Sequence, residues 1–226
     1  ERGRGLQVFH VELEQRDVKD LQTPSAFVAP SGAISFITQN FAGMKNTGYE
    51  VELIANPVEG LSLFAFLGRQ DAKYKDLAPA IVTQQQECLK GIAGQPGGVL
   101  ARCNQGIIDP SGRVAEPVRT PDTLTVGGSY QFRIGDDLTL TPNVLWAHTG
   151  DNNVGTNGTP SGLVTAYEQV DLGLTLASQT GGWQVQANCR NCTDTTQVVS
   201  VLSDTVYIQD PRTWSLMFKY NFGARR

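Results

Sequence analysis

The stretch "PRTWSLMFKYNFGARR", residues 211–226, closes the chain and alternates apolar with mostly polar side chains. Successive side chains of a β-strand point to opposite faces, so one face of a strand here receives only large apolar groups. These groups are Trp214, Leu216, Phe218, Tyr220 and Phe222. Such a strand either covers a core with a second sheet in water, or faces lipid in a membrane barrel whose lumen is polar.

Seven other segments are also predicted to be strands, because apolar and polar residues alternate in them or residues with high β-propensity dominate. In 165–177, for example, Val170, Leu172 and Leu174 alternate with Gln169 and Asp171. The seven segments are 5–15, 33–41 continuous with 48–55, 61–68, 124–134, 138–146, 165–177 and 183–188. With the closing strand, the sequence predicts eight strands.

The connections between these segments are of two kinds that alternate along the chain. Turn-forming residues occupy the short ones, at 56–60, 135–137 and 180–182. The long ones are 17–32, 76–119, 150–163 and 200–208. All short turns therefore lie at one end of the sheet, which predicts an all-β fold, an antiparallel transmembrane β-barrel with short periplasmic turns and long extracellular loops.

The longest connection leaves two alternatives open. Ile81, Cys88, Leu89 and Ile92 are spaced to share one face of a short helix. An irregular loop with scattered apolar residues is the other interpretation. The Asn- and Gly-rich segment 150–163 predicts an exposed flexible tip.

Composition excludes several classes of protein. The 226 residues have a formal net charge of −4 with both signs interspersed, so no basic surface indicates a nucleic-acid partner. No apolar run approaches the roughly 18 residues of a transmembrane helix. One domain of this length is ordinary for an all-β protein.

The four cysteines form two pairs in sequence. Cys88 and Cys103 bracket a loop rich in glycine, and they are either bridged, for about 3 kcal/mol of stabilisation, or two unpaired thiols. Cys189 and Cys192 would point to opposite faces of a straight strand, so a bridge between them requires a bend. A zinc site lacks a second pair of ligands.

Catalytic motifs are not found in the sequence. His10 and His148 are far apart, and neither has a second metal-binding residue at a recognisable spacing. Glu50 and Glu52 share a strand face, where solvated charges on a lumen wall are the favoured interpretation over a catalytic pair. We therefore expect a protein that is not an enzyme and has no cofactor and no bound metal.

Three stretches resemble the TonB-dependent outer-membrane receptors. "YIQDPRTWSLMFKYNF" at 207–222 is similar to the last strand of that family, and "NCTD" at 191–194 to the step that ends the penultimate strand. Residues 46–77 resemble the family's Gly-x-Glu-x-Glu strand with its periplasmic turn and the next strand. The resemblance implies that 1–226 is the C-terminal segment of a larger barrel, about eight strands of about 22, without the plug domain and the N-terminal strands.

The resemblance also implies a function. Members of the family sit in the bacterial outer membrane and take up a scarce nutrient, such as an iron–siderophore complex, cobalamin or an oligosaccharide. The expected partners are outer-membrane lipid, a nutrient bound at the loops 76–119 and 150–163, and the TonB complex through the missing N-terminal region. The closing strand, Trp214 to Phe222, is then a lipid-facing and assembly element.

Two other functions stay open from the sequence. Eight strands suffice for a complete small outer-membrane barrel with a structural or adhesive role. A secreted soluble β-sandwich that binds carbohydrate, with or without enzymatic activity, is the second alternative. It predicts that the apolar face of the closing strand is buried in protein.

Overall fold

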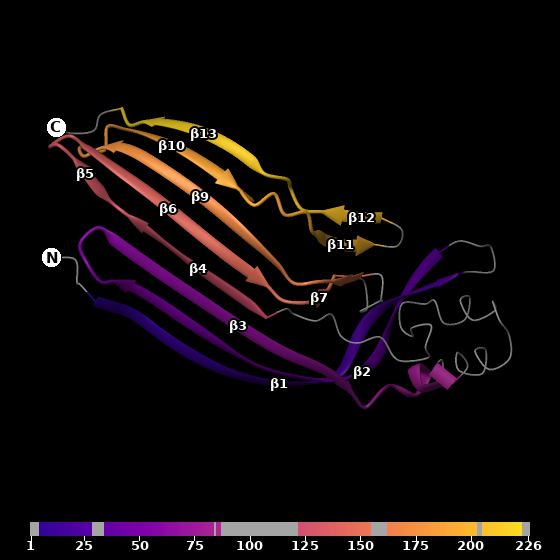
Figure 1. The fold of residues 1–226 in the computed structure, drawn as a ribbon. Coiled ribbons are helices and arrows are strands. Elements are labelled where there is room, and N and C mark those ends of the chain that lie inside the picture. Colours follow the sequence, from indigo (N-terminus) through magenta and orange to yellow (C-terminus); the bar gives the residue numbers. More distant parts are fainter. Residues whose placement is uncertain are drawn as a thin grey trace.

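A computed structural model describes residues 5–28, 34–83, 85–86, 122–154, 162–202 and 205–222. Its main sheet is an antiparallel meander in which each strand pairs with the next (Figure 1). The strands are β1 (Gly5–Val28), β2 (Ile34–Asn56), β3 (Leu61–Lys75), β4 (Thr123–Tyr130), β6 (Leu138–Thr149), β9 (Tyr167–Ser178), β10 (Trp183–Arg190) and β13 (Thr213–Tyr220). The short β5 (Phe132–Ile134) continues β4 and also pairs with β6. The eight predicted strands and their antiparallel order are confirmed.

The two ends of this sheet differ as the sequence predicted. The short turns lie together at the left end in Figure 1. The right end carries two small hairpins, β7 (Asn152–Asn153) with β8 (Leu163–Val164), and β11 (Val198–Leu202) with β12 (Thr205–Ile208). Both places were predicted to be loops, and this prediction was wrong because such brief pairings leave no alternation in the sequence.

The sheet does not close on itself. Among the described residues β1 pairs only with β2, and β13 only with β10. A complete eight-stranded barrel requires β1 and β13 to pair with each other. This arrangement contradicts the small complete barrel.

Very little of the apolar surface is buried in protein. Within the described part of the chain the buried hydrophobic residues are Phe41, Ala42, Ile81, Val164, Cys189 and Val201. The closing strand is exposed along its whole length. A soluble sandwich would cover that face with a second sheet, so the sandwich alternative is wrong.

The predicted loop at 17–32 is mostly strand. β1 and β2 continue as a long hairpin whose last described pair is Val28 with Ile34. The charged and polar residues between Asp17 and Thr23 suggested a loop. Backbone pairing outside a bilayer needs no continuous apolar face, so this hairpin shows no sustained alternation in sequence.

Two further boundaries differ from the prediction. The segment 124–134 is interrupted at Gln131, whose N–H donates to the Gly60 carbonyl at 2.9 Å instead of joining the ladder. A helical turn begins at Pro79 and includes Ile81, as the helix hypothesis required. Its other members, Cys88, Leu89 and Ile92, lie outside the described residues. No helix in the described part of the chain is long and apolar enough to cross a membrane.

The turn between β2 and β3 allows a test of this packing. Gly60 has a φ of +84°, and a Cβ added there would lie 2.8 Å from the Gln131 carbonyl oxygen. Gly135 in the next short turn has a φ of +59°, with nothing within 4 Å of an added Cβ. We expect Gly60→Ala to lower the free energy of unfolding of the intact protein by about 2–3 kcal/mol, and Gly135→Ala by about 1 kcal/mol. Denaturant unfolding in lipid vesicles measures both, and equal losses would contradict the close contact.

Candidate functional site

One face of the sheet is apolar from edge to edge. Residues directly opposite in antiparallel strands share a face, so the pairing extends each row across the sheet. One row contains Val11, Val51, Leu67 and Leu124. Another joins Leu140, Leu176, Val185 and Phe218. The alternation in single strands therefore adds up to one continuous surface, which we call the apolar band.

Aromatic residues border this band at both ends. At the short-turn end, Trp183 lies opposite Tyr220, and the rings of Tyr130 and Phe132 are 4.5 Å apart. At the long-loop end, the Trp146 indole N–H donates to a Glu168 carboxylate oxygen at 3.2 Å. Amphipathic rings occupy such borders in membrane barrels. From Leu138 to Trp146, β6 rises roughly 27 Å, or about 21 Å normal to a membrane at a 40° tilt, close to the usual apolar height of a barrel.

The residues predicted for the lipid face all belong to this surface. Trp214, Leu216, Phe218 and Tyr220 lie opposite the β10 residues of the band, and the Phe222 ring is 4.8 Å from that of Tyr220. Their exposed fractions run from 52% for Tyr220 to 92% for Phe222. Contact of these five side chains with lipid stays a prediction.

The opposite face is polar and acidic near β1 and β2. His10 lies opposite Glu52, and Glu12 opposite Glu50. Glu14 on the same face is 3.4 Å from the Arg16 guanidinium. Glu50 and Glu52 therefore belong to a larger acidic wall, as expected for solvated lumen charges.

Asn191 organises the long-loop end of β10. Its side chain is 3% exposed, and its amide donates to the carbonyls of Thr195 at 2.8 Å and Asp210 at 3.2 Å. The amide oxygen accepts from the Thr195 N–H at 2.9 Å. The Asn191 N–H donates to Asp171 of β9 at 2.8 Å. We call this arrangement the Asn191 clasp, because it joins β9, the turn after β10 and the segment before β13.

A disulfide between Cys189 and Cys192 lies within the clasp. The bend that it requires is present, because Asn191 has a φ of +49° and the Cys192 N–H donates back to the Val170 carbonyl at 2.7 Å. In the chain-entropy model so short a loop gives about 2 kcal/mol of stabilisation. The sequence left the state of these two cysteines open, and the bridge excludes them as metal ligands while oxidised.

Arg212 connects the clasp to the closing strand. Its N–H donates to Asp194 Oδ1 at 3.1 Å, and its guanidinium lies 3.5 Å from Asp194 Oδ2. The same guanidinium donates to the Cys192 carbonyl at 3.3 Å. Arg212 immediately precedes β13, so these contacts fix the point at which the closing strand begins.

A small core holds the start of the longest loop. Ile81, Phe41 and Ala42 are buried together, and the Ala78 N–H donates to the Phe41 carbonyl at 2.8 Å. Tyr74 packs on Phe41 with ring centroids 4.7 Å apart, and burial raises the pKa of its phenol. The helical turn is therefore fixed against β2.

An ion pair lies beside this core, beyond the apolar band. The Lys75 ammonium donates to Asp17 Oδ1 at 2.7 Å. This hydrogen bond holds the pKa of the Asp17 carboxyl below its usual range and raises the pKa of Lys75. Both groups are solvated, so the pair contributes little to stability.

Other parts of the expected site are not brought together. Cys88 and Cys103 lie outside the described residues, as do most of 76–119 and the tip of 150–163. In the described segments no group of three His, Cys, Asp or Glu side chains is placed to hold a metal. The resemblance of "NCTD" did not reveal that Asn191 is buried, because burial of a polar residue leaves no mark in hydropathy.

Sequence comparison finds no match, either to a protein-family model or to a curated protein. Comparison of structures finds several matches. A ferric preacinetobactin receptor from Acinetobacter baumannii matches 92% of this chain with a TM-score of 0.55 at 16% identity, over 26% of its own length. A copper transporter, OprC, matches 94% with a TM-score of 0.61 at 13% identity, over 28% of its length. The ferric-catecholate import receptor Fiu from E. coli K12 matches 92% at 0.54 and 17% identity, over 25% of its length.

These matches establish the fold. The chain has the fold of part of an outer-membrane β-barrel, and the resemblance to TonB-dependent receptors is confirmed at the level of the fold. The chain spans about a quarter of the length of the solved receptors that it matches. The matched proteins are receptors and transporters of the outer membrane, which supports the expected location.

Adjacent residues of β13 test the facing of the sheet. Phe218 lies in the apolar band, whereas Met217 lies opposite Gln186 on the polar face. We expect Phe218→Arg to destabilise the intact protein in lipid by roughly 2–4 kcal/mol, because it places a charge near the middle of the band. Met217→Arg and Lys219→Ala should change the free energy of unfolding little. Equal losses for Phe218→Arg and Met217→Arg, measured by unfolding in vesicles, would show that the facing is wrong.

The clasp gives a second test. We expect Asn191→Ala to lower the free energy of unfolding by about 2–4 kcal/mol, because it removes the hydrogen bonds of a buried amide to the carbonyls of Thr195 and Asp210 and places alanine at a positive φ. Asn188→Ala in β10 is the control, since it removes only two bonds between side chains, one to Ser215 at 3.4 Å and one from Gln186 at 3.0 Å. Unfolding midpoints in vesicles compare the two. A loss for Asn191→Ala no larger than the control would count against the clasp.

Proposed function

We propose that this chain forms the C-terminal part of the barrel of an outer-membrane receptor that imports a scarce nutrient with energy from the TonB complex. The continuous apolar band with two open edges carries the proposal. A sheet with an uncovered apolar face belongs in lipid. Its free edges require further strands, since backbone groups in a bilayer have no water to bind.

The nutrient is bound at the long-loop end in this proposal. The loops 76–119 and 150–163 supply part of the binding surface. The helical turn at Pro79, fixed against Phe41, and the β7–β8 hairpin support it, because they anchor the described bases of both loops to the barrel wall. A rigid base reduces the entropy lost when a loop closes on a ligand.

A metal complex is the nutrient that we favour among an iron–siderophore complex, cobalamin and an oligosaccharide. Two of the matched structures are named as receptors for ferric complexes and one as a copper transporter. The barrel itself carries out no chemistry in this proposal, and its residues position the ligand and line the route. Energy coupling requires the plug and the TonB-binding segment of the intact receptor.

The proposal is tested in the bacterium that carries the gene. Deletion of the whole gene should reduce growth when one nutrient is limiting, and the intact gene should restore it. A receptor in which both loops are replaced by Gly-Ser linkers should reach the outer membrane yet fail to bind that nutrient. Replacement of the short turn 180–182 by the same linker is the control and should leave binding unchanged. Unchanged growth of the deletion strain under iron, copper, cobalamin and oligosaccharide limitation would overturn the proposal.

A further inference from the structure

The hairpin of β1 and β2 bends above the apolar band. At the bend its register shifts twice, between Val18 and Leu21 and again between Leu21 and Gln22. Asp20, inside the first shift, has a φ of +52°. Beyond this point the hairpin leaves the direction of the sheet (Figure 1). Bulges of this kind bend a strand and redirect its side chains, and they are common beside binding sites.

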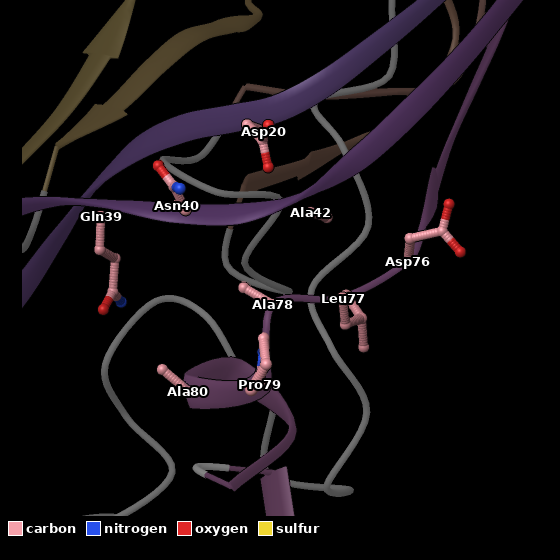
Figure 2. Close-up of a pocket in the computed structure, with 9 residues that line it drawn as sticks. All are labelled: Asp20, Gln39, Asn40, Ala42, Asp76, Leu77, Ala78, Pro79 and Ala80. Carbon is pink, nitrogen blue, oxygen red and sulfur yellow. The ribbon is translucent and has the colours of Figure 1, made fainter.

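The segment after β3 faces the bend and forms a second wall. Residues 77–80 lie across from Asp20 and Gln39 (Figure 2). The contacts of Phe41, Ile81 and Ala78 hold this wall in place. Both walls are therefore built on the small core, and the space between them is formed before any ligand arrives.

This space, which we call the bend pocket, has a volume of about 520 Å³. Volumes of roughly 300–1,000 Å³ are usual for small-molecule sites. Its lining residues are Asp20, Gln39, Asn40, Ala42, Asp76, Leu77, Ala78, Pro79 and Ala80. The small side chains of Ala78 and Ala80 keep the wall formed by residues 77–80 from filling this space.

The polar groups of the pocket favour donors from a ligand. In Figure 2 the Asp20 carboxylate and the Gln39 amide point into the space, whereas the Asp76 carboxylate points away from it. In the described part of the chain Asp20 has no hydrogen bond or ion pair, and no residue that lines the pocket is basic. The nearby Lys75 ammonium is already bound by Asp17. Among the described residues the charge of Asp20 therefore has no fixed counter-charge.

We propose that the bend pocket binds a protonated amine of the imported ligand through the Asp20 carboxylate. The inference rests on the proposed function and narrows it, because it names the chemistry of one ligand group. A charge-assisted hydrogen bond to a carboxylate is stronger than one between neutral groups. An anionic metal chelate finds no cation among the described lining residues and is repelled by Asp20. Among metal complexes the pocket therefore selects those that carry an ammonium group.

The test uses the intact receptor in detergent and a small probe that does not depend on the nutrient. Binding of 1,5-diaminopentane and of its diacetylated form is measured by ligand-observed NMR. We expect the acetylated form to bind at least about tenfold more weakly, as loss of a charge-assisted hydrogen bond predicts. Asp20→Asn should weaken binding of the diamine by a similar factor and leave binding of the acetylated form unchanged. Asp136→Asn, in the short turn at the other end of the sheet, is the matched control and should change neither.

The outcomes separate this inference from the proposed function. Equal binding of the two probes, or diamine binding that survives Asp20→Asn, would overturn the amine site while nutrient-dependent growth still supports the receptor. No binding of the diamine at millimolar concentration would overturn it as well. Growth that does not depend on the gene would overturn the receptor itself, whatever the probes show.

Discussion

Backbone hydrogen bonding is the constraint on which the rest of this structure depends. A bilayer offers no water to an exposed N–H or C=O group, so a spanning strand must find its partners in neighbouring strands. The six inner strands of the meander have partners on both sides, and the outer strands β1 and β13 have one each. An apolar face makes lipid the favourable environment, but only strands beyond both edges make the sheet stable there. This chain covers about a quarter of the length of the matched receptors, which agrees with a sheet that is only part of a barrel wall.

Pairing alone does not fix register, and in this sheet a slip by one residue would turn Phe218 and its row toward the lumen. β13 is held at both ends. Arg212 and the Asn191 clasp fix its beginning. Just beyond its end, the Asn221 side chain and N–H donate to the carbonyls of Gly181 and Gly182 at 2.6 and 2.8 Å. A strand exposed along its length has little packing to correct an error, so specific hydrogen bonds at its ends set the register.

The sequence predicts what depends on alternation, and little else. A period of two predicts the strand segments from 138 to 220 and places Trp214 to Phe222 on one face. This period is present because lipid on one side of the sheet and water on the other select the side chains along the whole strand. Above the band no bilayer selects one apolar face of β1 and β2, so the alternation is lost and the hairpin at 17–32 was taken for a loop. The bridge between Cys189 and Cys192 depends on the left-handed backbone at Asn191, which spacing does not reveal. The bend pocket depends on two register shifts, and shifts leave no pattern in hydropathy.

The two ends of the sheet therefore have different physical roles. The apolar band is built from interchangeable side chains, since lipid requires an apolar surface and no particular shape, and single substitutions between Leu, Val and Phe there change little. The long-loop end is built from individual contacts, such as Asn191 with Asp210 or Ala78 with Phe41, and each has no substitute nearby. Selectivity for a ligand requires such fixed polar groups, because apolar contacts alone discriminate weakly between molecules of similar size. Any chemical choice that this wall makes must come from the residues above the band, where the backbone bends and where charges such as Asp20 stand without a partner among the described residues.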